Sequence, residues 1–240
     1  MIRSFYTSVA GMSSEMTDIS ALSNDVSNQA TIGYKGDFDS MLMASANPLS
    51  YGMGGLVRGT GVLSTVTSLD LTQGALQQTT NPFDMALQGA GFFALQTPTG
   101  TMYTRNGAFH IAANGQLVNA DGDVVLGANK APIQFPDLQG KAVTVSVNGV
   151  IQVGTSTIGQ VGVFNATGWA KSGADLFTPT GAVSAAPQTF IRQSMLEQSN
   201  VNLSTVLGSM ISSQRAFSAS AQMQQYAYQM LTEATDSIAK

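Results

Sequence analysis

Hydrophobic side chains recur at helical spacing near both ends of the chain. From Val201 to Ile238 they are three, four or seven residues apart, which predicts one long helix with an apolar seam. Near the N-terminus the mean spacing is about 3.5 residues, a period that favours a left-handed coiled coil. We therefore expect the two ends of the chain to pair as helices. Their seams consist of Phe5, Val9, Met12, Met16, Ile19, Leu22 and Val26, and of Leu203, Leu207, Met210, Phe217, Ala221, Tyr228, Leu231 and Ile238.

The C-terminal helix carries almost no charge on any face. Between Val201 and Thr232 the one charged side chain is Arg215, whereas a solvated helix normally carries Lys and Glu on its outer face. At about 1.5 Å per residue the segment extends roughly 55 Å, more than internal packing requires. We expect other copies of the chain to cover it, so the seam residues are the predicted subunit interface. The predicted boundary signals are Asn28 and Gly33 after the first helix and Ser199 and Asn200 before the second.

The middle of the chain changes to a period of two, which predicts strands. The strongest hairpin signal is Asn148-Gly149 between two alternating runs, read as a two-residue turn, and similar pairs begin at residues 106, 114 and 121. Residues 36–73 have no sustained period and contain Pro48 and several glycines, so we expect an extended linker there. The core candidates of the strand region are Phe92, Phe93, Tyr103, Phe109, Leu117, Val125, Leu126, Phe135, Phe164 and Phe177.

These patterns together predict an α+β fold. The N- and C-terminal helices pair as an α-helical coiled coil, and a mainly antiparallel all-β domain is inserted between them. The expected boundaries are 1–35 for the first helix, 36–73 for the linker, 74–190 for the β domain and 191–240 for the second helix.

Composition narrows the classes of partner. Charged residues make up 10% of the 240 residues, far below the roughly 25% of ordinary soluble proteins, and such a surface suits assembly. The net charge is -4 and Lys and Arg do not cluster, which argues against nucleic acid and acidic membranes as partners. The chain has no Cys and no apolar run of 18 residues, so we expect neither disulfides nor a membrane span. The first residues also lack the apolar stretch of a cleaved secretion signal.

We find no catalytic, cofactor or metal constellation in the sequence. His110 is the single histidine and is expected to be a surface or half-buried strand residue. Asp121 and Asp123 lack the further oxygens of a calcium loop and are expected in a turn. The run that begins at Gly89 matches a dinucleotide-binding pattern, but a strand rather than a helix is expected after it, so we reject that interpretation.

Two further groups of residues have ordinary explanations. Arg105 has the chemistry to bind an anion, but pairing with a neighbouring carboxylate is the commoner role of a strand-end arginine. The helix methionines suggest adaptable packing rather than a metal site; they are Met12, Met16, Met210, Met223 and Met230.

With these residues in view, the chain resembles the rod proteins of the bacterial flagellar basal body, the FlgF and FlgG types. The N-terminal match is Leu22 to Asn28 followed by Thr31, Gly33, Tyr34 and Lys35, with Asp25 and Ser27 where Asn and Ala are more usual. The C-terminal match is Ser199 to Asn202, Met210-Ile211 and Gln214 to Phe217. The central match is Gly74, Leu76, Asn81-Pro82, Asp84, Gly91 to Phe93, Tyr103 to Arg105 and Leu117-Val118.

The resemblance implies a structural subunit, without cofactor or catalysis, that polymerises helically through its terminal helices. The family forms a hollow drive shaft that crosses the periplasm, carries motor torque to the hook, and reaches its place by flagellar type III export without a cleaved signal. Its partners are copies of itself and other axial flagellar proteins. The short length and Asn81 to Asp84 favour the proximal type, FlgF, whereas Ile2 to Ser4 and Gln214 to Phe217 favour the distal type, FlgG; we favour FlgF.

Two other classes remain open from the sequence. One is a secreted β-domain binding module, an adhesin or carbohydrate binder, whose helices only dimerise it. The other is a hydrolase with Asp84 or Asp121 as base, which has little support in the sequence. Growth of assemblies with concentration distinguishes the rod subunit from the binding module.

Overall fold

The computed structural model describes the backbone of residues 2–43, 62–136, 141–186 and 188–238, and the side chains of most of them. The chain forms two compact units. The helical unit comprises residues 1–27, 37–68 and 202–240, and the β unit comprises residues 28–36 and 69–201. Each unit is described separately below.

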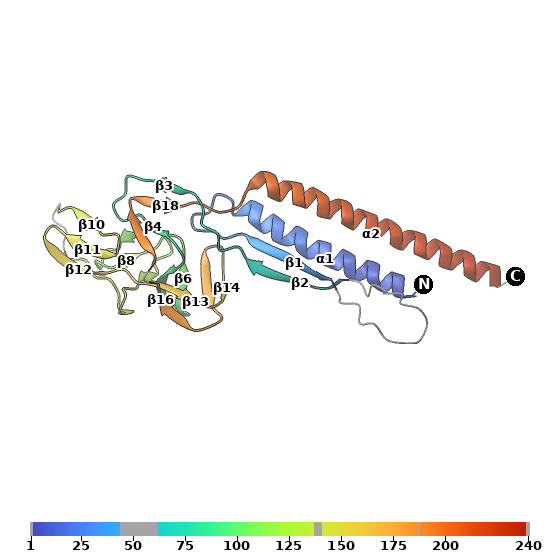
Figure 1. The fold of residues 1–240 in the computed structure, drawn as a ribbon, viewed down its shortest axis with the longest axis horizontal. Coiled ribbons are helices and arrows are strands. Elements are labelled where there is room, and N and C mark those ends of the chain that lie inside the picture. Colours follow the sequence, from blue (N-terminus) through green and yellow to red (C-terminus); the bar gives the residue numbers. More distant parts are fainter. Residues whose placement is uncertain (1, 44–61, 137–140, 187, 239–240) are drawn as a thin grey trace. The chain divides into compact units, whose positions relative to one another are not determined.

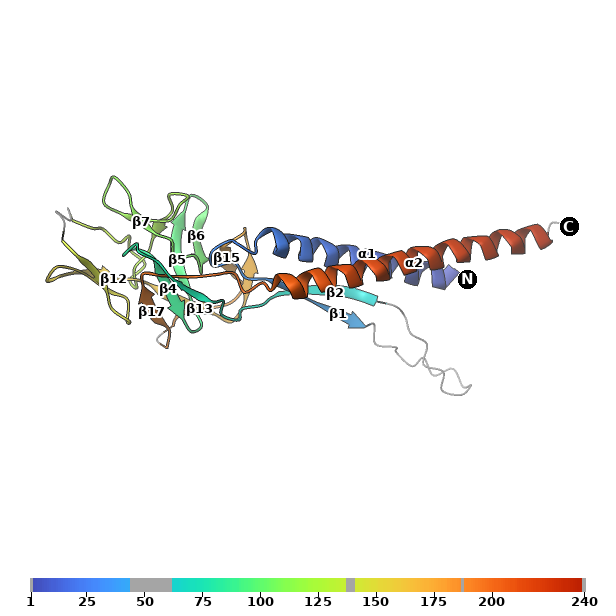
Figure 2. The same ribbon diagram turned by 90° about the horizontal axis from the view of Figure 1, so that it is seen from above.

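Two helices and a small sheet make up the helical unit. Helix α1 (Ile2–Ser27) and helix α2 (Leu203–Ile238) pack against each other and run antiparallel (Figure 1). Strands β1 (Asp37–Met43) and β2 (Val62–Leu69) form a two-stranded sheet, and β1 contacts α1. Because α2 has 36 residues and α1 has 26, the C-terminal end of α2 extends beyond the start of α1, as Figures 1 and 2 both show. The predicted helix pair is confirmed.

Local hydrogen bonds satisfy many of the hydroxyl groups on these helices. Along α1 a row of hydroxyls donates to carbonyl oxygens one turn earlier, from Thr17, Ser20, Ser23 and Ser27. In α2 Ser218 donates in the same way to the Gln214 carbonyl, at 2.9 Å. These hydroxyl groups are therefore satisfied inside their own helix, although such bonds do not by themselves stabilise a helix.

The helix ends differ partly from expectation. Helix α1 ends at Ser27, directly before Asn28, and Gly33 follows with a φ of 72° that favours glycine. Helix α2, however, is capped by Asn202, whose Oδ1 accepts hydrogen bonds from the backbone N–H of Ser204 at 3.1 Å and of Thr205 at 3.3 Å. The predicted start signals Ser199 and Asn200 are therefore wrong as caps, because these residues belong to the β unit.

The segment expected to be an extended linker, 36–73, contains strands β1 and β2, and its residues 44–61 lie outside the described part. The Asp37 backbone N–H donates to the buried Asp25 carboxylate at 3.1 Å, which ties the start of β1 to the last turns of α1. Pairing with each other and contact with α1 explain why these two strands form without a sustained sequence period.

The β unit is antiparallel throughout its described strand pairs. Its main sheet has the path β14-β15-β6-β5-β9-β8-β7, with β13 pairing both β5 and β16. These strands are β5 (Phe92–Thr97), β6 (Gly100–Thr104), β7 (His110–Ile111), β8 (Leu117–Val118), β9 (Val124–Val125), β13 (Val163–Ala166), β14 (Trp169–Lys171), β15 (Leu176–Pro179) and β16 (Val183–Ala185).

Three smaller sheets complete the β unit. One is formed by β10 (Val143–Val145), β11 (Val150–Val153) and β12 (Ser156–Gln160). Strand β4 (Met85–Gln88) pairs with β17 (Phe190–Gln193), and β3 (Leu76–Gln78) pairs with β18 (Met195–Glu197). The boundary expected at residue 190 therefore falls inside a strand. Residues 190–197 form too short a run for periodicity to distinguish strands from the beginning of the following helix.

All ten core candidates of the β domain are buried. Phe93, Phe109, Leu117, Val125 and Phe135 belong to one hydrophobic cluster. A second cluster contains Phe92, Tyr103, Leu126, Phe164 and Phe177. The prediction of this core is confirmed. Phe92 and Phe93 are consecutive in β5 and belong to different clusters, so both faces of this strand are covered.

The glycine turns follow one pattern with one exception. Gly115, Gly122 and Gly149 have φ values of 79°, 87° and 81°, and each closes a loop between neighbouring antiparallel strands. In each loop the glycine N–H donates to a carbonyl three residues earlier. Ser146 also donates its N–H to the Val150 carbonyl, so three residues lie inside this closing pair rather than the two expected from Asn148-Gly149. Gly107 is the exception, because it makes no hairpin; a Cβ at its position would lie 1.5 Å from the Met85 carbonyl oxygen.

Candidate functional site

The predicted interface residues lie on two packed helices, and none of their described side chains is fully buried. Those of Phe5 and Ile238 lie outside the described residues. The exposed ones are Val9, Met16, Leu203, Leu207, Tyr228 and Leu231, and the half-buried ones are Met12, Ile19, Leu22, Val26, Met210, Phe217 and Ala221. Their role in contacts between subunits stays a prediction.

Burial of apolar side chains is very uneven between the two units. Among the residues whose side chains are described, every buried hydrophobic one belongs to the β unit, and none belongs to α1 or α2. Covering one side chain of the size of Leu or Met contributes about 1.5–3 kcal/mol. The described side chains of α1 and α2 therefore leave apolar surface available for association, whereas the β unit has a core of its own.

The predicted seam misses four exposed residues of α2. Met223 and Tyr226 are 66% and 63% exposed, and Ile211 and Met230 are also exposed. The spacings of 203, 207 and 211 and of 223, 226 and 230 are three or four residues, which is the signal that identifies them. Helix α2 thus presents apolar side chains on more than one face, as expected for a helix with several neighbours.

The surface between these residues carries few charges. The described residues of α2 include Arg215, Glu233 and Asp236 as its charged side chains, with no acidic residue in the first turn and no basic one in the last. In the middle of α2 a shallow groove is lined by Ile211, Gln214, Arg215, Ser218, Ala219 and Gln222. Covering such a surface removes few charges from water, so its desolvation costs little.

A cluster of buried charges lies in the β unit. Glu197, at the end of β18, is fully buried. Its Oε1 accepts a hydrogen bond from Lys35 Nζ at 2.6 Å, and its Oε2 accepts one from Arg105 Nη1 at 3.0 Å. Lys35 is 0% exposed and Arg105 is 3% exposed. Two cations therefore share one carboxylate in the protein interior.

Backbone groups add hydrogen bonds to these charges, although the buried Nε of Arg105 has no partner among the described residues. The Gly74 N–H donates to Glu197 Oε1 at 2.9 Å. Lys35 Nζ donates to the Thr72 carbonyl at 2.6 Å, and Arg105 Nη2 donates to the Gly89 carbonyl at 2.7 Å. The Arg105 guanidinium also lies over the Phe92 ring, 5.1 Å from its centroid. Carbonyl dipoles and a ring face thus assist one carboxylate in compensating two positive charges.

Burial lowers the pKa values of the two cations of the cluster. It lowers the pKa of Lys35 below its ordinary value, and the hydrogen bond and negative charge of Glu197 oppose the shift. Burial also lowers the pKa of Arg105, again against the charge and hydrogen bond of Glu197. Burial therefore disfavours the charged form of both cations, and the shared carboxylate opposes this effect.

Asn200 extends the cluster with hydrogen bonds. Its Oδ1 accepts from the Gly36 backbone N–H at 2.9 Å. Its Nδ2 donates to the Asp70 carbonyl at 2.8 Å and contacts Thr72 Oγ1 at 3.2 Å. Lys35, Arg105 and Asn200 come from three separate sequence motifs, and the structure brings them together. From the sequence alone we did not predict this cluster and did not single out Glu197.

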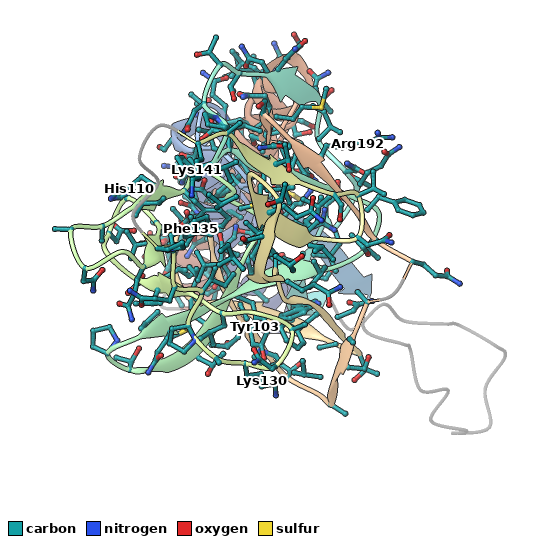
Figure 3. All side chains as sticks on the ribbon, turned by 90° about the vertical axis from the view of Figure 1, so that its left-hand side faces the viewer. Tyr103, His110, Lys130, Phe135, Lys141 and Arg192 are labelled. Atoms are coloured by element: carbon teal, nitrogen blue, oxygen red, sulfur yellow. The ribbon has the colours of Figure 1, made fainter. Side chains whose placement is uncertain are left out.

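The other residues weighed for chemistry have structural roles. His110 is exposed on β7, at the edge of the β unit in Figure 3. Asp121 and Asp123 lie in the turn between β8 and β9, where Asn119 Oδ1 accepts both of their backbone N–H groups. The run that begins at Gly89 leads into strand β5, and Arg105 pairs with a carboxylate, both as predicted. Neither described helix is apolar enough along its length to cross a bilayer.

Comparison with known proteins places this arrangement in a family. Residues 86–153 match the family "Flagellar hook protein FlgE/F/G D1 domain", and residues 192–237 match "Flagellar basal body rod FlgEFG protein C-terminal". The first match lies in the β unit, and the second covers β18 and almost all of α2.

Full-length relatives give the same result. The chain is 32% identical over 250 residues to the flagellar basal-body rod protein FlgG of Bacillus subtilis, with 90% of this chain and 92% of that protein covered. It is 28% identical over 224 residues to FlgF of Mesorhizobium japonicum, covering 89% and 88%. It is 29% identical over 238 residues to FlgF of Caulobacter vibrioides, covering 96% of each. The chain therefore belongs to the FlgF/FlgG family of flagellar basal-body rod proteins, and it is a structural subunit of the rod.

Proposed function

We propose that this subunit polymerises through α1 and α2 into a helical drive shaft that transmits motor torque to the hook. The observation that carries the proposal is the unequal burial of the two units. The β unit has two hydrophobic clusters of its own, whereas the described side chains of the helical unit include no buried hydrophobic one. Copies of the chain and other axial flagellar proteins are the partners that would cover this surface.

The assembly would be open rather than closed. Helix α2 is longer than α1 by several turns and leaves Tyr228, Met230 and Leu231 exposed near its C-terminal end. A neighbour that covers this end presents the same end to the next copy, so the proposed contact is head-to-tail, and a rotation between copies that does not close on itself would generate a filament. The weakly charged helices would line the central channel, and the β units would form an outer layer that stiffens the tube.

We place the rod in the periplasm, reached by the flagellar type III export route without removal of a signal peptide. The absence of Cys in the 240 residues fits passage into an oxidising space without unwanted pairing. A narrow export channel also favours a chain whose helices become ordered only when neighbours bury them.

We propose further that the chain is of the proximal type, FlgF. The alignments with B. subtilis FlgG and M. japonicum FlgF cover almost the same share of this chain, 90% and 89%, but the FlgG alignment extends over 250 positions and the FlgF alignment over 224. The FlgG alignment therefore has more positions without a counterpart here, although its identity of 32% is higher than 28%. Restoration of motility in a deletion strain of one rod gene, and not of the other, tests the assignment.

Sedimentation of the full chain over a range of concentrations tests the assembly proposal. We expect species that grow with concentration, whereas a variant reduced to residues 28–36 and 69–201, joined by a short Gly/Ser linker, stays monomeric and folded. The reduced variant keeps Lys35, because removal of residues 1–35 would take part of the β unit with the helix. A discrete dimer of the full chain that never grows would contradict the proposal and favour a dimeric binding module.

A further inference from the structure

The chain passes between the helical unit and the β unit four times. The crossings follow Ser27, Gly36, Ser68 and Val201. On the β-unit side they belong to three segments, one that covers residues 28–36, one that begins at residue 69 and one that ends at residue 201. The two units are therefore connected by four covalent links rather than by a single linker.

Backbone hydrogen bonds hold these three segments together inside the β unit. The Gly33 N–H donates to the Glu197 carbonyl at 2.8 Å, and the Asp70 N–H donates to the Gly36 carbonyl at 2.9 Å. The Gln198 N–H donates to the Ala75 carbonyl at 2.8 Å. Each segment is thus bonded to another within a few residues of a crossing.

Side chains join the same three segments a second time. Lys35 belongs to the first segment, Glu197 and Asn200 belong to the last, and their partners Thr72 and Asp70 belong to the middle one. Arg105, at the end of β6, attaches Glu197 to the main sheet. We call Lys35, Arg105, Glu197 and Asn200 the junction clamp.

Stability alone does not explain a clamp of this composition. Two buried cations on one carboxylate cost desolvation energy, and apolar side chains of similar volume often stabilise a protein as much or more. Buried ion pairs with several hydrogen bonds fix the direction and distance of their groups, which apolar contacts do not. The clamp is therefore better suited to fixing the geometry of the crossings than to increasing the free energy of unfolding.

We infer that the junction clamp is the mechanical coupling of the subunit, which fixes the crossings after Gly36, Ser68 and Val201 to the β unit so that a twist of the helices reaches the β unit through three links at once. This inference rests on the proposed role of the rod as a drive shaft. A single flexible link lets one unit rotate without turning the other. Three links held at fixed separations resist that rotation, because it would have to stretch them or break the hydrogen bonds of the clamp.

Hydrogen exchange on the full chain tests the first half of the inference. The variant Lys35→Met keeps the volume of the side chain and leaves Glu197 paired with Arg105 at equal charge. We expect the amides of Gly33, Gly36 and Asp70 to exchange about tenfold faster, as for the loss of one hydrogen bond, with the amides of β5 unchanged. Lys141→Met is the matched control, because Lys141 is an exposed lysine of the same unit (Figure 3). Unchanged exchange at the three amides, or equally faster exchange in β5, would overturn the clamp.

Swimming against load tests the second half. Asn200→Ala, at a half-buried position, removes the bonds to Gly36 and Asp70 without leaving a charge unpaired, so it serves as a second variant. Cells that carry either clamp variant should form normal numbers of flagella and swim normally in dilute buffer, but lose at least half of their speed relative to Lys141→Met in a viscous polymer solution. Equal speeds at every viscosity would overturn the coupling role. If the unmodified chain fails to restore motility to a rod-deletion strain, the drive-shaft proposal is wrong, and the exchange experiment still decides whether the clamp holds the crossings.

Discussion

Lys35 and Glu197 are 162 positions apart in the sequence, yet their side chains form a 2.6 Å ion pair with neither group exposed. Each residue lies a few positions from a terminal helix, Lys35 after α1 and Glu197 before α2. The pair therefore holds two segments of the β unit together near the points where the chain leads to β1 and to α2. Arg105 shares the same carboxylate. Loss of the carboxylate and loss of one cation should therefore have different effects on stability.

Glu197→Gln should be far more disruptive than Lys35→Met. The first change leaves two cations buried without a carboxylate and should lower the free energy of unfolding by about 3–5 kcal/mol, whereas the second leaves a balanced Arg105–Glu197 pair and should cost less than about 1.5 kcal/mol. Urea unfolding followed by the fluorescence of Trp169, the single tryptophan of the chain, reports on the β unit because its ring packs 4.3 Å from that of Phe92. Equal losses for the two variants would show that the carboxylate is not the centre of the cluster.

Lys35 should also make the free energy of unfolding depend on pH in the alkaline range. Burial lowers its pKa in the folded chain below the ordinary 10.5, so between the two values the unfolded chain binds a proton that the folded chain has lost. Stability then rises with pH through that interval and levels off above 10.5. The difference in unfolding free energy between the wild type and Lys35→Met should therefore shift in favour of the wild type as pH increases from 7.

Tyr103 has the opposite effect on the pH dependence of stability. For this reason the measurement compares the wild type with Lys35→Met rather than the wild type alone. Burial raises its pKa above 10.0, so the folded chain keeps its proton when the unfolded chain has lost it, and stability falls as pH rises above that value. Both proteins contain Tyr103, so this contribution cancels. A difference that stays constant from pH 7 to 10.5 would mean that Lys35 titrates alike in both states.

The β-domain core illustrates what the sequence predicts well. Residues such as Phe93, Phe109 and Phe177 are large, apolar and set in a pattern of period two, and each is buried. Local chemistry was equally informative for the glycines of the hairpin turns, because a left-handed backbone conformation selects glycine whatever lies around it. Both signals depend on residues that are close in sequence.

The junction clamp illustrates what the sequence does not predict. Arg105 and Glu197 are separated by 92 positions, and no periodicity links them. The first-turn cap of α2 was misplaced for a related reason, since Asn200 has the chemistry of a cap but bonds to Gly36 and Asp70, two segments that arrive from elsewhere in the chain. Tertiary partners decide between equivalent local signals, and those partners are visible only in the fold.

Gly107→Ala should destabilise the β unit strongly. A Cβ at this position would lie 1.5 Å from the Met85 carbonyl oxygen, and the Gly107 carbonyl accepts the Met85 N–H at 3.0 Å. The two backbones must separate, which should cost more than about 3 kcal/mol. Gly159→Ala is the matched control, because nothing lies within 4 Å of the new Cβ, and it should change stability by less than about 1 kcal/mol. Trp169 fluorescence in urea distinguishes the two outcomes, and equal effects would contradict the close approach at residue 107.

Met223→Gln and Tyr226→Gln should separate assembly from folding. Both side chains are more than half exposed. The free energy of unfolding of the dilute chain, measured by thermal unfolding followed by circular dichroism, should therefore change by less than about 0.5 kcal/mol. If a neighbouring copy buries them, each substitution weakens the association free energy by about 1.5–3 kcal/mol. This raises the concentration needed for assembly by about 10- to 100-fold. Val147→Gln, at an exposed apolar position of the β unit, should have a much smaller effect because the proposed contacts lie on the helices. Sedimentation gives the assembly threshold of each variant, and motility of a rod-deletion strain gives its consequence. Normal assembly and swimming with both helix variants would mean that this face of α2 stays open to solvent in the rod.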